Sequence, residues 1–352
     1  HRAKNNPEAL RNIYTTNALN QYTAKTNKSL AASGTTQDDP ALNVAVQAGG
    51  KTVKADRLGR IWNAELSALN SNGLNPSGLN TNGPWRDLFT VYTGKAGSPA
   101  TVQTSVRLAQ IAALNQTFAY DLDGNLTFDG LWDYAWDAEN RLIRQTTAAG
   151  AVAAGVRNIA LEYRYDYLGR RVQKLVIDAA ANRLIYGRRF LYDGWNLIAE
   201  YALNAQLSAL TLVRSYTWGL DIARTLSEAG GVGALLQIAD HPSGKTYFPA
   251  YDGNGNIVAL VNSSTGTTAA AYEYSPFGEQ LRADAPDSVV ADQPFRFSTK
   301  YTDSETGLVY YGRRYYEPKQ GRLSGVIPKA KQAARTCMPS QSTIRSIDGT
   351  SL

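Results

Sequence analysis

The stretch YDLDGNLTFDGLWDYAWDAENRLI (residues 120–143) decides the fold of this chain. It twice places an aromatic residue before Asp, then Gly or Asn, and then aliphatic residues. The Asp-x-x-Gly and Asp-x-x-Asn steps are typical of tight turns, because Asp accepts backbone N–H groups and Gly or Asn adopts positive φ. The aliphatic residues that follow begin the next strand. The stretch therefore predicts successive β-hairpins.

The same unit recurs along the chain from residue 118 onward. Within YRYDYLGRRVQKLV (163–176), Tyr163 and Tyr165 point to the same face, because side chains alternate along a strand. A helix is excluded, because the aromatic pairs recur at i, i+2 and Gly interrupts the units. The aromatic anchors of the copies are Tyr120, Trp136, Tyr165, Tyr192, Tyr251 and Tyr274, and SYTWGLD (215–221) is a degenerate copy.

One such hairpin cannot bury its apolar face alone, so neighbouring hairpins stack and bury their faces jointly. The composition agrees, because the 21 Tyr and 30 Gly residues favour many strands joined by tight turns. Charged residues make up only 19% of the chain, which excludes a charge-rich disordered tail or a coiled coil. We expect residues 118–322 to be predominantly antiparallel β, with strands centred near Tyr120, Tyr165, Tyr192 and Tyr251.

Residues 118–322 resemble the YD-repeat, or RHS, family. The match is carried by residues 120–143, by YEYSPFGEQ (272–280) and by PFRFSTKYTDSETGLVYYGRRYYEPKQGR (294–322), which is similar to the RHS repeat-associated core. The resemblance implies an antiparallel sheet that spirals into a hollow shell. Such shells enclose or present a variable C-terminal polypeptide, often a toxin, in bacterial competition, and related shells serve in insecticidal toxin complexes. It also implies a secreted or cell-surface protein.

The sequence divides into five expected segments. They are an N-terminal fragment of a repeat unit (1–37), a small β-rich, sandwich-like insertion (38–107), the YD repeats (118–271), the RHS-associated core (272–322) and an aberrant, disordered tail (323–352). The segment VRLAQIAAL (106–114) has helix-like apolar spacing but fits a linker strand equally well. The chain starts at His1 rather than Met, and we expect the natural N-terminus to precede it.

The tail departs from the family pattern. After residues 320–322, relatives of this type continue with an aromatic residue and an NLYAF-like segment, whereas this chain has no aromatic residue after Tyr316. We interpret the change as a frameshift near Leu323; the alternative is a short variable C-terminal extension. The resemblance also implies an aspartate-dependent self-cleavage after the core. The sequence around Asp348 does not match that motif, so no cleavage residue is assigned.

Charge and composition exclude several classes of protein. Half of the formal net charge of +6 comes from residues 325–352, so the body of the chain lacks the basic footprint of a nucleic-acid-binding protein. The one cysteine, Cys337, excludes an internal disulfide. No apolar run reaches the roughly 18 residues that a membrane span needs.

Few residues suggest chemistry. The chain has two histidines, His1 and His241, and a Ser-His-Asp hydrolase would need His241 as its base. His241 precedes a proline and no nucleophile elbow accompanies it, so a loop role is favoured. The segments DLDGN (121–125) and DGNGN (252–256) place oxygen ligands at alternate positions, as calcium loops do. Neither is followed by the bidentate Glu of an EF-hand, and turn formation explains both.

Two further motifs have structural explanations. GGVG (230–233) is glycine-rich but lacks the Lys-Ser/Thr ending of a phosphate loop, and we expect a flexible hairpin tip there. YYGRRYYEP (310–318) interleaves cations and aromatic rings, which could indicate carbohydrate or nucleic-acid contact. Within an RHS-like core, arginine stacked among tyrosine rings is the favoured interpretation. The sequence therefore assigns no catalytic, cofactor-binding or metal-binding residue.

The resulting functional hypothesis is a non-enzymatic scaffold, part of a β-shell that encloses or presents a C-terminal polypeptide, incomplete in this chain. The expected partner is that enclosed cargo, which this sequence does not contain. The alternative is a cell-surface module that binds carbohydrate or a protein partner, for which an exposed aromatic patch would be the signature.

Overall fold

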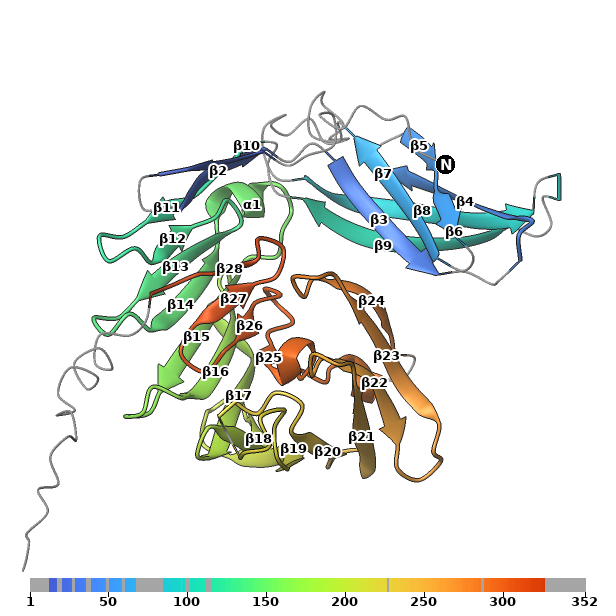
Figure 1. The fold of residues 1–352 in the computed structure, drawn as a ribbon. Helices are drawn as coiled ribbons and strands as arrows, with labels where there is room; N and C mark the ends of the chain where they lie inside the picture. Colours follow the sequence, from blue (N-terminus) through green and yellow to red (C-terminus); the bar gives the residue numbers. More distant parts are fainter. Residues whose placement is uncertain are drawn as a thin grey trace, which may run out of the picture.

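A computed structural model of the chain is built almost entirely of antiparallel β-strands (Figure 1). The structure describes residues 13–17, 21–26, 29–35, 39–48, 51–58, 61–67, 85–95, 97–98, 102–111, 115–226, 228–285 and 288–326. The predicted mainly antiparallel β fold is confirmed.

A short three-stranded sheet lies beside the first repeat. It contains β1 (Ile13–Thr16), β2 (Tyr22–Thr26) and β10 (Asn115–Thr117), with β2 in the middle. The N–H of Phe118 donates to the carbonyl of Thr23 over 3.0 Å, which fixes this sheet to the start of the repeats.

Two further sheets, inserted in the chain between β2 and β10, form a small sandwich. Their orders are β3–β7–β6 and β5–β4–β8–β9. The strands are β3 (Ser29–Thr35), β4 (Leu42–Ala48), β5 (Lys51–Lys54), β6 (Asp56–Leu58), β7 (Ile61–Ser67), β8 (Trp85–Lys95) and β9 (Gln103–Ile111). Val44, Val46, Trp62 and Leu66 belong to a separate buried core between the sheets.

The limits of this sandwich differ from the expected ones. The expected start was residue 38, but β3 (Ser29–Thr35) already belongs to the sandwich, because it pairs with β7 along its whole length. The segment 106–114, which fitted either a helix or a strand, is a strand over residues 106–111, and residues 112–114 lie outside the described part of the chain.

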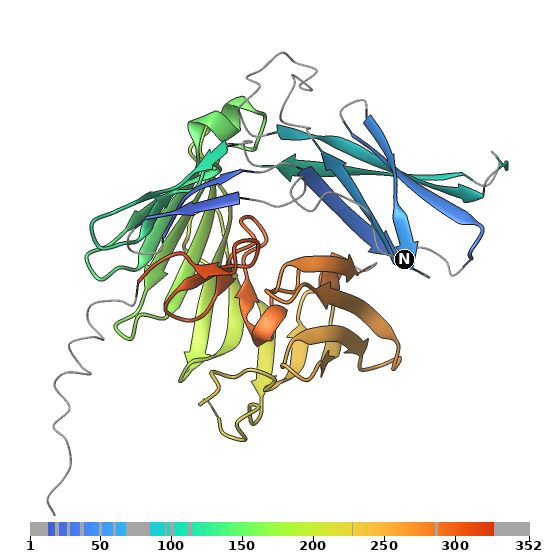
Figure 2. The same cartoon turned by 45° about the horizontal axis from the view of Figure 1, so that its top comes forward.

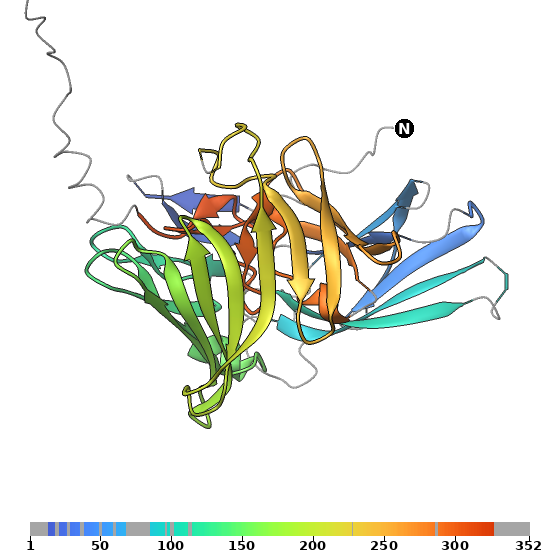
Figure 3. The ribbon, with the colours of Figure 1, turned by 90° about the horizontal axis from the view of Figure 1, so that it is seen from below.

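The repeats form one antiparallel sheet of 14 strands, in which each strand pairs with its neighbours in the chain. The strands are β11 (Ala119–Tyr120), β12 (Leu126–Phe128), β13 (Trp132–Trp136), β14 (Leu142–Thr147), β15 (Ile159–Tyr165), β16 (Arg171–Asp178), β17 (Arg183–Asp193), β18 (Asn196–Leu203), β19 (Leu210–Trp218), β20 (Leu235–Asp240), β21 (Lys245–Tyr251), β22 (Ile257–Asn262), β23 (Thr268–Tyr274) and β24 (Gln280–Asp284). A short helix, α1 (Ala149–Ala153), joins β14 to β15. The sheet curls strongly, as Figures 1 and 3 show.

Each aromatic anchor lies at or next to the end of an odd-numbered strand and coincides with an irregularity in pairing. The register between β15 and β16 shifts at Tyr165, and the register between β17 and β18 shifts at Tyr192. The same shift occurs at Tyr120, Trp136, Trp218, Tyr251 and Tyr274. A bulge of this kind increases local twist and bends the strand. A bulge repeated at every anchor therefore gives the sheet a systematic curvature.

The anchors also tie each hairpin to the one before it. The hydroxyl of Tyr165 donates to the carbonyl of Leu142 over 2.6 Å, and the hydroxyl of Tyr192 donates to the carbonyl of Arg171 over 3.0 Å. The corresponding pairs are Trp136 with Leu126, Trp218 with Leu197, Tyr251 with Leu235 and Tyr274 with Ile257. Each acceptor lies at the start of the even-numbered strand of the preceding hairpin. The anchors therefore make one ladder of hydrogen bonds along the edge where the repeat turns lie.

After β24 the chain turns back into the hollow of the sheet. A helical turn, α2 (Ser288–Ala291), leads into residues 293–326, which we call the insert. The insert contains the 3₁₀ turn η2 (Phe297–Thr299) and a small sheet of β25 (Tyr301–Thr302), β26 (Val309–Tyr310), β27 (Tyr315–Glu317) and β28 (Arg322–Leu323). Figures 1 and 2 show the insert on the concave side of the large sheet.

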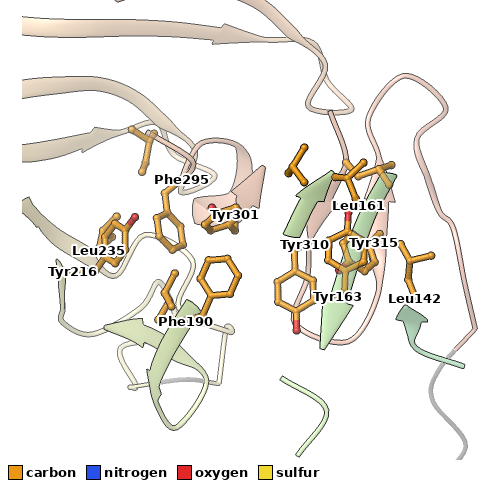
Figure 4. Close-up of a cluster of buried hydrophobic side chains, with 14 of the residues drawn as sticks. Leu142, Leu161, Tyr163, Phe190, Tyr216, Leu235, Phe295, Tyr301, Tyr310 and Tyr315 are labelled. Atoms are coloured by element: carbon orange, nitrogen blue, oxygen red, sulfur yellow. The ribbon is translucent and has the colours of Figure 1, made fainter. Parts of the chain in front are cut away.

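The main hydrophobic core lies between the sheet and the insert. Phe190 and Tyr216 of the sheet face Phe295 and Tyr301 of the insert (Figure 4). The Tyr216 and Phe295 rings meet edge to face, with centroids 4.9 Å apart. The inward residues of the repeats are therefore buried by the insert as well as by their neighbours.

The expectation that packing stops at Leu323 is wrong for residues 323–326. Leu323 is part of β28, and Ser324 is 7% exposed. The N–H of Leu126 donates to the carbonyl of Ser324, and the N–H of Val326 donates to Asn125 Oδ1. Backbone hydrogen bonds of this kind need no apolar side chain, so the loss of the aromatic pattern did not reveal them. Residues 327–352, the rest of the expected tail, lie outside the described part.

Candidate functional site

The most strongly organised polar group in the described residues is the seat of the insert on the sheet. Arg171, at the start of β16, is only 1% exposed. Its guanidinium carbon lies 4.6 Å from the ring centroid of Tyr310 and 5.0 Å from that of Tyr301. Three more rings surround it, those of Tyr163, Phe190 and Tyr315, at 5.2–5.8 Å. The electron-rich faces of these rings stabilise the buried cation.

A buried carboxylate completes this cage. Asp303 of the insert is fully buried, and its Oδ2 lies 2.6 Å from Arg171 Nη1. Its Oδ1 lies 2.9 Å from Lys174 Nζ, which also contacts Glu305 Oε2 over 3.0 Å. Two cations of β16 are thus neutralised by two carboxylates from the turn between β25 and β26. Removing one charged member of such a group destabilises the fold, because it leaves a buried charge uncompensated.

The pKa values of these groups follow from their packing. Burial is the largest influence on Asp303 and acts to raise its pKa, but the charges of Arg171 and Lys174 outweigh burial and hold the pKa below its ordinary value. Burial acts to lower the pKa of Lys174, but Asp303, Tyr301 and Glu305 together raise it above its ordinary value. Asp303 and Lys174 therefore keep their charges at neutral pH.

A second carboxylate holds the insert two strands further along. Glu200 of β18 is 1% exposed and accepts hydrogen bonds from Tyr216 and from Tyr301 of the insert, over 3.0 and 3.2 Å. Arg188 supplies its nearest cation, at 3.0 Å. Asp303 is a carboxylate of the insert that contacts cations of the sheet. Glu200 is a carboxylate of the sheet that accepts a hydrogen bond from the insert.

The repeat turns hold a third part of the insert. Thr299 Oγ1 donates to the carbonyl of Gly255 over 2.7 Å and accepts the N–H of Gly233 over 2.8 Å. The N–H of Ser298 donates to Asn256 Oδ1 over 2.7 Å. The expectation that GGVG (230–233) is a flexible hairpin tip is therefore wrong, because the insert hydrogen bonds to its backbone.

The aspartates of the expected calcium-like loops are used within their own turns. Asp121 accepts the backbone N–H of Asn125 with one oxygen and its side-chain amide with the other, over 2.8 and 2.9 Å. Asp252 makes the same two bonds to Asn256. Among the described residues, no group of three His, Cys, Asp or Glu side chains is placed to hold a metal ion. Turn formation accounts for the geometry of both segments.

His241 does contact a serine, but the arrangement differs from a catalytic triad. Its Nε2 lies 2.9 Å from Ser215 Oγ in an exposed hydrogen bond. The neighbouring Asp240 accepts hydrogen bonds from Ser243 instead and faces Arg214 at 3.5 Å. The carboxylate that could orient the imidazole is therefore used elsewhere.

The motif YYGRRYYEP (310–318) contributes its rings to the cage but not its arginines. Tyr310 and Tyr315 surround Arg171, whereas Arg313 lies over the ring of Trp195, 4.9 Å from its centroid. Sequence reasoning missed Arg171 and Asp303, because nothing within a single repeat marks them. Arg171 and Lys174 are three residues apart, so strict alternation would place them on opposite faces of the strand. Only the register shift between Arg171 and Gln173 brings both of them inward, and the sequence pattern does not signal it.

The fold and this seat permit a comparison with known proteins. Residues 106–326 match the family described as the Teneurin YD-shell. The chain belongs to the Teneurin YD-shell family. The resemblance to YD-repeat, or RHS, shell proteins is thereby confirmed, and the YD-shell match ends at the last described residue of the insert.

Several bacterial proteins named as nucleases are similar to this YD-shell chain. The tRNA nuclease WapA of Bacillus subtilis is 35% identical over 241 residues, which is 68% of this chain and 9% of the relative. The probable deoxyribonuclease RhsA of Dickeya dadantii is 30% identical over 195 residues, covering 54% of this chain and 11% of the relative. The chain therefore spans about a tenth of the length of these relatives.

Among solved structures, a Tc holotoxin pore of Photorhabdus luminescens is similar, with a TM-score of 0.49 and 17% identity. That similarity covers 90% of this chain and 14% of the other chain. No helix in the described residues is long and apolar enough to cross a membrane.

Proposed function

We propose that this chain is a non-enzymatic wall of a YD-shell that encloses a toxin-like polypeptide in bacterial competition. The observation that supports this most is the seat of the insert. The insert leaves the last strand, crosses the concave face and returns to the first hairpin at Asn125. It thus braces the curled sheet from within, as a scaffold requires.

The chemistry of the seat supports a structural role. Arg171 and Lys174 are neutralised by Asp303 and Glu305, and Arg171, Lys174 and Asp303 are buried, so these three are not available to a substrate. The names of the relatives describe nucleases, but the similarity lies in a shell-forming region that covers 9–11% of their length. We assign such activities to other segments of those proteins and infer that this chain, as part of a toxin shell, works outside the cell that makes it.

Enclosure is tested by proteolysis of the natural polypeptide that contains this chain. The cargo segment of that polypeptide is expected to resist proteinase K in native buffer and to be cut after the shell is unfolded in urea. An Asp303→Asn variant, with its seat weakened, is expected to expose that segment at lower urea concentrations. Equal cutting rates in native buffer and in urea would contradict enclosure.

The absence of catalysis has its own test. The purified 352-residue chain is incubated with transfer RNA and with duplex DNA, with and without divalent cations. We expect no cleavage. Cleavage that copurifies with the folded chain and disappears in a Ser215→Ala variant would overturn the scaffold assignment.

A further inference from the structure

A cavity of about 1360 Å³ lies beside the seat, between the insert and the repeat turns. Its walls include Trp195 from the turn between β17 and β18, Asn196 at the start of β18, and Lys300 and Arg313 from the insert. A second cavity of about 560 Å³ adjoins it near the end of the insert. The two cavities share the lining residues Arg314, Arg322 and Leu323, and the smaller one is also lined by the carboxylates Asp123 and Glu317.

The lining of the larger cavity is strongly cationic. It contains Lys300, Arg313, Arg314 and Arg322, against a single carboxylate, Glu228. This excess of positive charge in a recess with aromatic walls concentrates anions, because low-dielectric walls focus the field of fixed charges. Residues 1–324 have no comparable excess of positive charge, since half of the formal net charge of the whole chain comes from residues 325–352.

Arg314 is the key cation of this site. Its side chain is partly buried where the two cavities meet, and it makes no hydrogen bond or ion pair with other residues that the structure describes. Every cation of the adjacent seat, by contrast, is paired with a carboxylate. A guanidinium presents a rigid fork of donors that suits carboxylates and other planar anions.

Two neighbouring cations are held in position. Arg313 is stacked on Trp195, which fixes the plane of its guanidinium. Lys300 donates to the carbonyl of Gly230, and burial lowers its pKa to about 8. A partly buried ammonium of this kind gains more from a nearby anion than a fully solvated one does, because the anion relieves its desolvation.

We propose that the larger cavity beside the seat binds an acidic polypeptide segment, with Arg314 as the principal ligand for its carboxylates. Its volume of about 1360 Å³ suits a chain segment better than a small ion. Arg313 lies over one face of the Trp195 ring, so that face is not available for stacking on a sugar. The choice of a polypeptide rests on the proposed shell function, under which the ligand is an acidic stretch of the enclosed polypeptide.

The test measures binding of a fluorescein-labelled hexaglutamate peptide to the 352-residue chain by fluorescence anisotropy. We expect saturable binding that weakens as ionic strength rises. Arg314→Gln is expected to weaken the affinity about tenfold, which corresponds to about 1.4 kcal/mol. The matched control is Arg189→Gln, because Arg189 is exposed on β17, away from both cavities.

Three results would overturn the proposal. They are no binding of hexaglutamate, equal losses of affinity in the Arg314 and Arg189 variants, and tighter binding of an oligogalacturonate than of hexaglutamate, which would make the ligand an acidic glycan. Circular dichroism of both variants shows whether the fold is intact. Enclosure is measured separately by protease resistance, so a shell that protects its cargo but does not bind hexaglutamate would refute this inference alone.

Discussion

Arg171 of β16 and Asp303 of the insert are 132 residues apart in sequence, yet they form a fully buried ion pair with 2.6 Å between Nη1 and Oδ2. The pair connects a strand in the middle of the repeat sheet to the segment that fills the hollow of that sheet. The repeats and the insert are therefore expected to fold and unfold as one unit, because neither partner can be left buried without the other.

The first prediction concerns this pair. Asp303→Asn keeps the size of the side chain but leaves Arg171 and Lys174 with only Glu305 as a counter-charge. We expect the free energy of unfolding to fall by about 3–5 kcal/mol, measured by urea denaturation followed through tryptophan fluorescence. Asp193→Asn, at an exposed position of β17, is the control and is expected to change it by less than about 0.5 kcal/mol. Similar losses in both variants would mean that the pair does not stabilise the fold.

The second prediction concerns acid. Folding lowers the pKa of Asp303 below its ordinary value of 3.8. A carboxylate of this kind stabilises the fold above its unfolded pKa, and the stabilisation is lost as the pH falls through the folded pKa. The stability difference between the natural chain and Asp303→Asn is therefore expected to be constant from pH 7 to about 5 and to shrink below about pH 4. A difference that grows on acidification would contradict the charged state of Asp303.

The third prediction concerns the ladder of anchors. Tyr192→Phe removes the hydroxyl that donates to the carbonyl of Arg171, while it keeps the ring. We expect the free energy of unfolding to fall by about 0.5–1.5 kcal/mol, the usual contribution of one such hydrogen bond. Tyr167, which lies in the turn between β15 and β16 and is 90% exposed, provides the control substitution Tyr167→Phe, for which no loss is expected. A neutral Tyr192 variant would show that ring packing alone holds the hairpins together.

The repeat architecture could be predicted from the sequence, because every repeat contains the same local pattern of residues. Tyr165 ends its strand and Tyr192 lies next to the end of its strand. Asp166 accepts the N–H groups of its own turn, and aliphatic residues lie at or near the start of the next strand. These features depend on neighbours within a few residues, so a pattern reveals them. The resemblance to a known family then indicated that the sheet curls into a shell.

The sequence was not sufficient for the seat or for the end of the insert. The partner of Arg171 lies in a different segment, and a single sequence does not state which buried charges will meet. Residues 323–326 are held by backbone hydrogen bonds and by a close approach of Gly325 to Trp136, neither of which needs an apolar side chain. The contacts between distant segments therefore had to come from the structure.

The fourth prediction concerns the contact between the last repeat turn and the insert. Gly278 has a φ of +84°, and a Cβ added there would lie 2.5 Å from the ring of Phe297. That ring is held between Tyr274 and Tyr316, with centroids 5.9 and 6.3 Å away, so it cannot move aside freely. Gly278→Ala is therefore expected to carry both a backbone cost and an overpacking cost of about 1–3 kcal/mol.

Gly266 separates these two costs. Its φ is +69°, but a Cβ added there would meet no atom within 4 Å. Gly266→Ala therefore carries only the backbone cost of about 1–2 kcal/mol for an L-residue in the left-handed region. Urea denaturation is expected to show that Gly278→Ala is less stable than Gly266→Ala by the overpacking cost. Near-ultraviolet circular dichroism of Gly278→Ala is expected to show a changed environment of Tyr316. If the two variants lose the same stability, Phe297 does not press on the turn, and the insert is seated on the last repeat less tightly than its geometry indicates.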